Sequence, residues 1–176
     1  MERALWVLIV VAVWVLLVWL MYRGWQRRGR RQAPAIGELP AVPNDFGAQV
    51  VEPTAGLYVG STTTETWQDR IAVGDLGFRA SAELTRFERG ILLERTGASA
   101  IWIPNVSIRN IRTQRGLAGK VMTADGLLVI RWLLPTGTEI DTGFRANDKS
   151  VYSTWTQPVA TEERSHDPFV LNGELE

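Results

Sequence analysis

The sequence predicts an N-terminal transmembrane α-helix followed by one mainly-β domain that ends in a short helix. Two observations predict the first helix: the run from Ala4 to Tyr22 carries no charge, and five arginines follow it within nine residues. A third observation predicts the β domain. From Gly56 onward, short segments alternate apolar and polar residues, and turn-forming residues separate them about every 8–12 positions.

The charge-free run is long enough to cross a bilayer. Its nineteen residues, at about 1.5 Å per residue in a helix, cover roughly the 30 Å of the hydrocarbon layer. A cleaved secretory signal fits less well, because such signals end in small residues and here Arg23 and Trp25 follow. A buried core helix is the other alternative, but it rarely lacks a polar face over this length. Trp6 and Trp25 are expected at the two membrane interfaces.

The distribution of positive charge predicts the orientation of the helix. Upstream of the run there is only Arg3, partly offset by Glu2, whereas cytoplasmic flanks are rich in Lys and Arg. We therefore expect a single-pass protein of the plasma (inner) membrane with its N-terminus outside and its domain in the cytoplasm. The expected cytoplasmic anchor consists of Arg23, Arg27, Arg28, Arg30 and Arg31.

Composition divides the chain into four regions. Residues 1–31 form the anchor with its basic flank, and residues 32–55, rich in Ala and Pro, are expected to form an extended linker. Residues 56–157 are the size of one ordinary domain. Residues 158–176 are predicted to be an acidic, disordered tail, and the lone histidine, His166, lies there.

The charge of the region after residue 43 argues against nucleic acid as a partner. Six of the 19 Lys and Arg residues and two of the 19 Asp and Glu residues lie within the first 43 positions. The remainder therefore has 13 cations and 17 anions, a net charge of −4, whereas nucleic-acid binding requires a basic face. The chain has no cysteine, so no disulfide or thiolate chemistry is predicted.

Alternation and turn residues predict about seven strands. The segment from Phe78 to Thr85 alternates cleanly, which is typical of a half-buried antiparallel strand. Asp125-Gly126 favours a tight turn, so we expect a hairpin between 117–123 and 127–134. The other expected strands are Gly56–Ser61, Asp69–Val73, Ile91–Arg95, Ala100–Ile103 and Thr138–Arg145, and Asn147 and Asp148 are expected to cap a helix over Lys149–Gln157.

These elements resemble a known family. The segment IWIPNVSIRNIRTQRG, with its strand and the pair Ile103-Pro104, resembles pleckstrin-homology-like (PH-like) domains of bacterial membrane proteins. The stretches GLYVGST, GKVMTADGLLVIRW and EIDTGFR are similar to those of small actinobacterial single-pass proteins, some of them labelled transporter or export protein. The resemblance implies two nearly orthogonal antiparallel sheets with a C-terminal helix closing one end. Trp102, Trp132 and Trp155 would then be core or plug residues.

Motifs for catalysis are weak. Asp141-Thr142-Gly143 resembles the triplet of aspartic peptidases, but that mechanism needs two carboxylates, and we expect an exposed Asp beside a bulge glycine instead. Gly116–Lys120 lacks the first glycine and the Ser/Thr of a phosphate loop, and His166 has no neighbouring ligand set. We therefore expect no enzyme, no cofactor and no metal.

Three functions remain open. The first is a non-enzymatic, membrane-anchored PH-like module that acts as a protein-binding scaffold or adaptor at the inner membrane face. The second is a module that binds anionic lipid through Arg109, Arg112 and Arg115, although their spacing along an extended segment would not place all three on one face. The third, implied only by the family label, is an accessory subunit of a transporter or export system.

Overall fold

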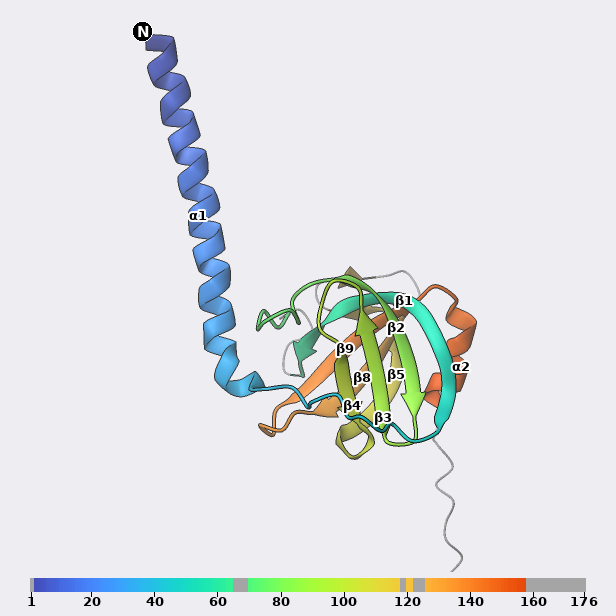
Figure 1. Ribbon diagram of the computed structural model, residues 1–176. Coiled ribbons are helices and arrows are strands. Elements are labelled where there is room, and N and C mark those ends of the chain that lie inside the picture. The colour runs from blue at the N-terminus through green and yellow to red at the C-terminus, as the bar shows by residue number, and fades with distance from the viewer. Residues whose placement is uncertain (1, 65–69, 118–119, 122–125, 158–176) are drawn as a thin grey trace, which may run out of the picture.

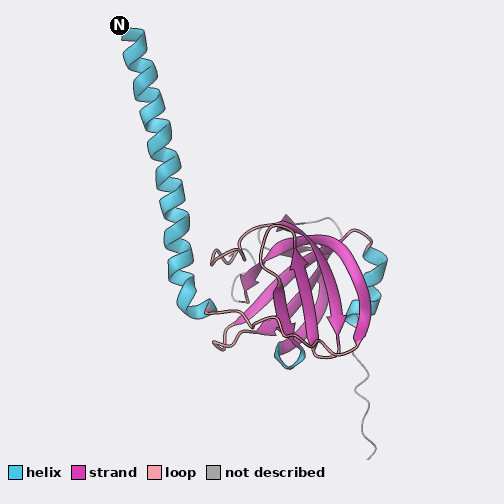
Figure 2. Ribbon diagram, in the orientation of Figure 1, coloured by secondary structure: helices cyan, strands magenta, loops and turns pink. Residues whose placement is uncertain are grey.

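The structure, a computed structural model, describes residues 2–64, 70–117, 120–121 and 126–157. One long helix, α1 (Glu2–Ile36), leads into a β domain, and Figure 1 shows α1 projecting away with the domain beside its C-terminal end. Figure 2 shows strands forming the wall of the domain, with a short helical segment at its far side. The expected order of a long apolar helix, a mainly-β domain and a C-terminal helix is confirmed.

The wall is a seven-stranded antiparallel sheet with the order β4-β3-β2-β1-β9-β8-β5, accompanied by a two-stranded ribbon of β6 and β7. The number of strands in the main sheet agrees with the sequence. The strands are β1 (Gln49–Thr63), β2 (Ala80–Phe87), β3 (Gly90–Arg95), β4 (Ile101–Pro104), β5 (Ile108–Gln114), β6 (Gly116–Leu117), β7 (Lys120–Val121), β8 (Leu127–Leu133) and β9 (Glu139–Ala146).

Strand β1 joins the two halves of the sheet. Its first part pairs with β2 up to Tyr58, and its second part pairs with β9 from Gly56 to Thr63. The register shifts between Tyr58 and Gly60, and Gly60 has a φ of 140°. A bulge of this kind bends and twists a strand, so the two halves of the sheet curl around a common core. The two sheets expected from the sequence are thus one continuous sheet folded at β1.

The hairpin predicted from the sequence assigns the wrong partner to β8. Strand β8 pairs with β5, with Gln114 opposite Leu127, and the expected partner 117–123 contributes only the short β6–β7 ribbon. Residues 122–125 lie outside the described part. The apolar side chain of Leu117 explains the difference, because it is fully buried with Val59 and Val129 and so belongs to the outer face of the sheet.

Two further sequence expectations differ from the structure. Helix α1 does not stop before the linker but continues to Ile36, and β1 begins at Gln49, seven residues before the expected start at Gly56. The expected strand Asp69–Val73 is not formed over its described residues, where Arg70 makes only an isolated bridge to Thr62. Residue 69 and the acidic tail lie outside the described residues.

The C-terminal helix forms as expected, although its first turn is 3-10. A short turn of that type, η2 (Lys149–Val151), precedes α2 (Tyr152–Thr156), and another, η1 (Asn105–Ser107), connects β4 to β5. The carboxylate of Asp148 accepts a 2.9 Å hydrogen bond from the Ser150 N–H, which is the predicted cap.

The core lies between the two halves of the sheet and is closed at both ends by the chain itself. Trp132 is fully buried in this core, as predicted, whereas Trp102 is 5% exposed and lies outside the core cluster, with its ring centroid 5.3 Å from that of Phe46. At one end, Trp155 of α2 is 1% exposed and donates a 3.2 Å hydrogen bond from Nε1 to Thr54 Oγ1. At the other end, the last residue of α1, Ile36, is also 1% exposed and belongs to the same apolar cluster.

Candidate functional site at the helix junction and on the outer face

The C-terminal end of α1 is fastened to the β domain by polar contacts as well as by Ile36. The side-chain Oε1 of Gln32 accepts a 2.8 Å hydrogen bond from the N–H of Ala72. The carbonyl oxygen of Ala35 accepts hydrogen bonds from the hydroxyls of Thr136, at 2.6 Å, and Thr138, at 2.7 Å. Carbonyl groups in the last turn of a helix have no partner within the helix, so the two threonines cap α1.

Closer to the apolar run, α1 lies against the loop of residues 71–79. Trp25 and Phe78 meet edge to face with their ring centroids 5.4 Å apart. Gly29 allows this approach, because a Cβ there would lie 2.8 Å from the carbonyl oxygen of Ala72. A cleft of about 410 Å³ remains between helix and loop, and Arg30 is one of its lining residues.

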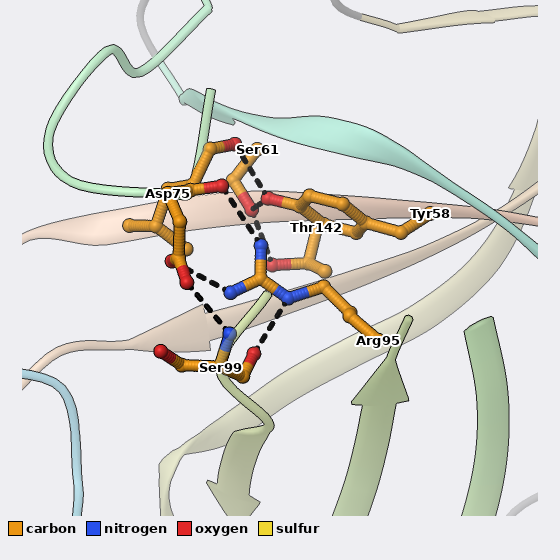
Figure 3. Close-up of polar contacts among 7 residues, drawn as sticks. Tyr58, Ser61, Asp75, Arg95, Ser99 and Thr142 are labelled. Atoms are coloured by element: carbon orange, nitrogen blue, oxygen red, sulfur yellow. Dashed lines mark hydrogen bonds and ion pairs between the residues drawn. The ribbon is translucent and has the colours of Figure 1, made fainter. Parts of the chain in front are cut away.

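The loop is held to the curled sheet, called the barrel below, by the fully buried side chain of Arg95, whose three guanidinium nitrogens all donate hydrogen bonds (Figure 3). Nη1 donates to the Asp75 carbonyl at 2.9 Å, Nη2 donates to Asp75 Oδ1 at 2.7 Å, and Nε donates to the Ser99 carbonyl at 2.8 Å. The Ser99 N–H completes the set at 2.7 Å from Asp75 Oδ2. Two loops that are distant in sequence are therefore tied to one strand.

The electrostatics of this set keep Asp75 ionised. Burial alone would raise the pKa of Asp75, but hydrogen bonds from the Ser99 N–H and from Arg95 outweigh it, and the pKa lies below its usual range. The guanidinium of Arg95 also lies 4.9 Å from the centroid of the Tyr58 ring, which is a favourable cation–π distance.

Tyr58 extends this network into the core, as Figure 3 shows. Its hydroxyl donates a 2.8 Å hydrogen bond to the Leu76 carbonyl and lies 3.0 Å from Ser61 Oγ. Ser61 in turn lies 3.0 Å from the Thr142 hydroxyl, which accepts a 2.9 Å hydrogen bond from Trp132 Nε1. Burial raises the pKa of Tyr58 to about 12. The hydroxyl is therefore a neutral structural link rather than a proton carrier.

A broad hollow, called the outer groove below, lies on the outside of the sheet. This outer groove has a volume of about 860 Å³ and crosses β3, β2, β1 and β9. Its floor is made of small residues, among them Ala55, Gly56, Ser81 and Ala82. Gly56 is required by the close approach of β9 and the core, since a Cβ there would lie 2.3 Å from the Arg145 carbonyl oxygen and 2.6 Å from the Phe144 ring.

The walls of the outer groove carry opposite charges. Glu83 on β2 and Glu94 on β3 are exposed and directly opposite each other in the strand register. Like charges in such cross-strand positions destabilise a sheet. Arg145 and Lys149 line the other side and are also exposed. Within the part of the chain that the structure describes, none of these four side chains forms an ion pair.

Two of the three arginines in and beside β5 form ion pairs. Arg112 Nη2 lies 2.7 Å from Asp141 Oδ2, and Arg109 Nε lies 3.9 Å from Glu139 Oε1. Arg115 also has an interaction partner. The predicted lipid site at these arginines stays a prediction, and a lipid phosphate there would compete with the carboxylates of Asp141 and Glu139.

Asp141 is buried rather than exposed, which corrects the expectation from the sequence. Its carboxylate accepts hydrogen bonds from Arg112 at 2.7 Å and from Arg131 at 2.9 Å. Burial alone would raise its pKa, but the two guanidinium groups outweigh it and hold the pKa below its usual range. A carboxylate held ionised by two arginines is unlike a proton-sharing pair. The neighbouring Gly143 instead makes room for Leu117, whose Cδ2 would lie 2.5 Å from a Cβ there.

The predicted anchor residues all lie on α1. Trp6 is 67% exposed, Trp25 is 42% exposed, and the guanidinium of Arg23 lies 5.2 Å from the centroid of the Trp19 ring. Arg23, Arg27 and Arg30 line one shallow hollow on the same face of the helix. Arg28 has an interaction partner, and Arg31 is exposed. Among the described residues, α1 is the one helix long and apolar enough to cross a membrane, and its apolar window is entirely unburied.

Comparison with known proteins assigns the domain. The Bacterial PH domain-like family matches residues 36–160, which is more than half of the chain, and the match begins at the buried Ile36. The chain belongs to this family. Neither the curated proteins nor the solved structures contain a significant match.

Membership agrees with the sheet order, the continuous β1 and the C-terminal helix of the PH-like domain. It also assigns a general function, because PH-like domains are binding modules rather than catalysts as a rule. No group of three or more potential metal ligands occurs in the residues that the structure describes.

The residues that hold the PH-like domain to α1 were not found from the sequence. Arg95 ends a predicted strand and Asp75 lies in a predicted loop, and nothing in their spacing indicates a pair. Gln32 and Ile36 fall in the expected linker. One available signal was Ile36 followed by Gly37, because an apolar residue before a glycine is typical of a helix end that contacts a core.

Proposed function

We propose that the protein is a non-enzymatic, membrane-anchored adaptor whose PH-like domain binds a protein partner in the outer groove, at the cytoplasmic face of the plasma membrane. The observation that carries the proposal is the groove itself: a floor of small residues between two acidic and two basic side chains without ion-pair partners among the described residues.

The closed ends of the barrel support this choice of surface. Ile36 fills one end and Trp155 fills the other, and both are 1% exposed. Within the described residues, a ligand that entered along the barrel axis would have to displace Ile36 or Trp155. The outer groove needs no such displacement, and its volume of about 860 Å³ can hold several side chains of a partner.

The charges of the groove define the partner. An extended segment with a basic side chain toward Glu83 and Glu94 and an acidic side chain toward Arg145 and Lys149 would neutralise all four groups. Binding would also relieve the repulsion between the two opposed glutamates. Complementary charges of this kind act mainly on specificity and association rate.

A photo-crosslinking amino acid in place of Ser81 tests the proposal in cells that express the full chain. We expect a defined adduct, and we expect Glu83→Lys together with Glu94→Lys to abolish it. The matched control is the same crosslinker at Val106, which is 89% exposed and lies in η1. An adduct that persists in the double variant, or that also forms at Val106, would refute the groove as the binding surface.

The orientation is tested separately, and the lack of cysteine makes the test clean. Val106→Cys should resist a membrane-impermeant maleimide in intact cells and react after lysis. Glu2→Cys, at the other end of α1, should react in intact cells. The reverse pattern would move the domain to the outside.

A further inference from the structure

The position along α1 at which a domain segment touches the helix gives the distance of that segment from the bilayer. The apolar run ends at Tyr22, and each later residue adds about 1.5 Å along the helix axis. Ala72 touches α1 at Gly29 and Gln32, whereas Phe78 touches it at Trp25. From Ala72 to Phe78, the loop therefore approaches the end of the apolar run.

The contact with Trp25 places Phe78 at the level of the lipid headgroups. Trp25 lies about 4.5 Å past Tyr22 along the axis, and the headgroup layer extends roughly 5–7 Å on each side of the hydrocarbon. Phe78 is 50% exposed and Trp25 is 42% exposed, so the pair presents aromatic surface to its surroundings. Amphipathic and aromatic side chains favour this layer.

Two arginines flank the pair, and no carboxylate of the described residues neutralises them. Arg79 follows Phe78 and is exposed, and Arg70 donates a 3.0 Å hydrogen bond to the Gly77 carbonyl. Burial and the positive charge of nearby Arg79 both lower the pKa of Arg70. In the described chain, neither arginine has an ion-pair partner. Two repelling cations beside exposed aromatic rings indicate an anionic ligand at this height.

We propose that Phe78 and Trp25, with Arg70 and Arg79, form a second membrane contact by which the β domain itself binds the headgroup layer of an anionic bilayer. The aromatic rings lie among the headgroups, and the two guanidinium groups bind lipid phosphates. This contact rests on the membrane-anchored half of the proposed function and is independent of the outer groove. It differs from the lipid site expected on β5, whose arginines already have partners.

The depth of position 78 tests the contact. Full-length Phe78→Cys, labelled with a nitroxide and reconstituted in vesicles of phosphatidylcholine and phosphatidylglycerol, should show an oxygen-to-nickel accessibility ratio between those of two controls. One control is Val15→Cys, inside the apolar run, and the other is Val106→Cys, in η1. The half-exposed position of Phe78 makes the substitution tolerable.

The lipid charge and the cations are tested with the same label. We expect the immobilised fraction to rise with phosphatidylglycerol, and Arg79→Gln to reduce this response about fivefold, the effect of about 1 kcal/mol for one cation near an anionic surface. Arg89→Gln is the matched control, because Arg89 is an exposed arginine in the turn between β2 and β3. Inorganic phosphate added in detergent should leave the spectrum unchanged.

The outcomes separate the two proposals. If position 78 matches Val106 in every vesicle while Val15 reports hydrocarbon, the headgroup contact is wrong and the anchor stands. If Val15 itself lies outside hydrocarbon, the anchor fails and the contact with it. A response that Arg89→Gln reduces as much as Arg79→Gln, or that free phosphate reproduces, would also overturn the contact.

Discussion

The two ends of the barrel are closed in different ways. At the far end, Trp155 comes from a helix that follows the last strand directly, so closure involves the domain alone. At the near end, Ile36 comes from α1, which is joined to the domain by the contacts of Gln32 with Ala72, of the Ala35 carbonyl with two threonines and of Trp25 with Phe78. The difference suggests that the far end belongs to the global folding unit, whereas the near end can open while the domain stays folded.

The largest effect is expected at the far end. Trp155→Ala should lower the free energy of unfolding by about 3–5 kcal/mol, because it removes a buried indole and leaves a cavity. Thermal unfolding of the full chain in detergent measures it. Trp14→Ala is the matched control, since Trp14 is 66% exposed on α1 and its loss should not alter the transition of the domain.

At the near end, Ile36→Ala should cost about 2–5 kcal/mol locally. Hydrogen exchange should show faster exchange at the Ala72 N–H, which Gln32 holds, with little change in β8 and β9. Val42→Ala, at a 43% exposed position, is the control. Equal acceleration in β8 and β9 would mean that both ends unfold together and that the contrast between them is wrong.

A smaller effect is expected from Asp75→Asn. The change removes the charged partner of fully buried Arg95 and should destabilise the loop of residues 71–79 by about 1–3 kcal/mol. Asp45→Asn is a matched control, because the ion pair of Asp45 with Arg89 is exposed and contributes about 0–1 kcal/mol. Chemical denaturation of both variants gives the comparison, and similar losses would remove the special role of Arg95.

The smallest effect is a pH dependence of the same contact. The folded-state pKa of Asp75 is depressed, so its contribution is fully present above the unfolded pKa of about 3.9 and is lost as the pH falls below it. The stability difference between the natural chain and Asp75→Asn should therefore be constant from neutral pH to about pH 4 and shrink in stronger acid. A difference that is unchanged in acid would contradict the ionised pair.

Much of the fold could be predicted, because each correct element depends on a local pattern. The apolar run of α1, the alternation of β2 and the Asp148 cap are all readable within a few residues. The hairpin prediction was wrong because Asp125-Gly126 is a local turn signal, whereas the strand that pairs with β8 is the more distant β5. Ile108 and Ile111 on β5 pack against the core when β5 pairs with β8.

The candidate site was harder to predict for the same reason. Arg95 and Asp75 are 20 residues apart and Gln32 and Ala72 are 40 apart, and no periodicity links such pairs. The arginines of β5 were conspicuous in the sequence because they are regularly spaced, yet the fold gives them carboxylates from β9. Arg70 and Arg79 were inconspicuous, and the fold leaves them beside Phe78.

Because α1 is continuous from the apolar run to Ile36, it fixes the direction in which the domain points around the helix axis as well as the position of the domain along that axis. An α-helix turns by about 100° per residue. One residue inserted near Gly24, where a side chain would meet open space, would swing the outer groove by more than a quarter of a circle around the helix. If α1 spans a membrane as proposed, the phase of this helix decides which neighbouring protein the groove faces.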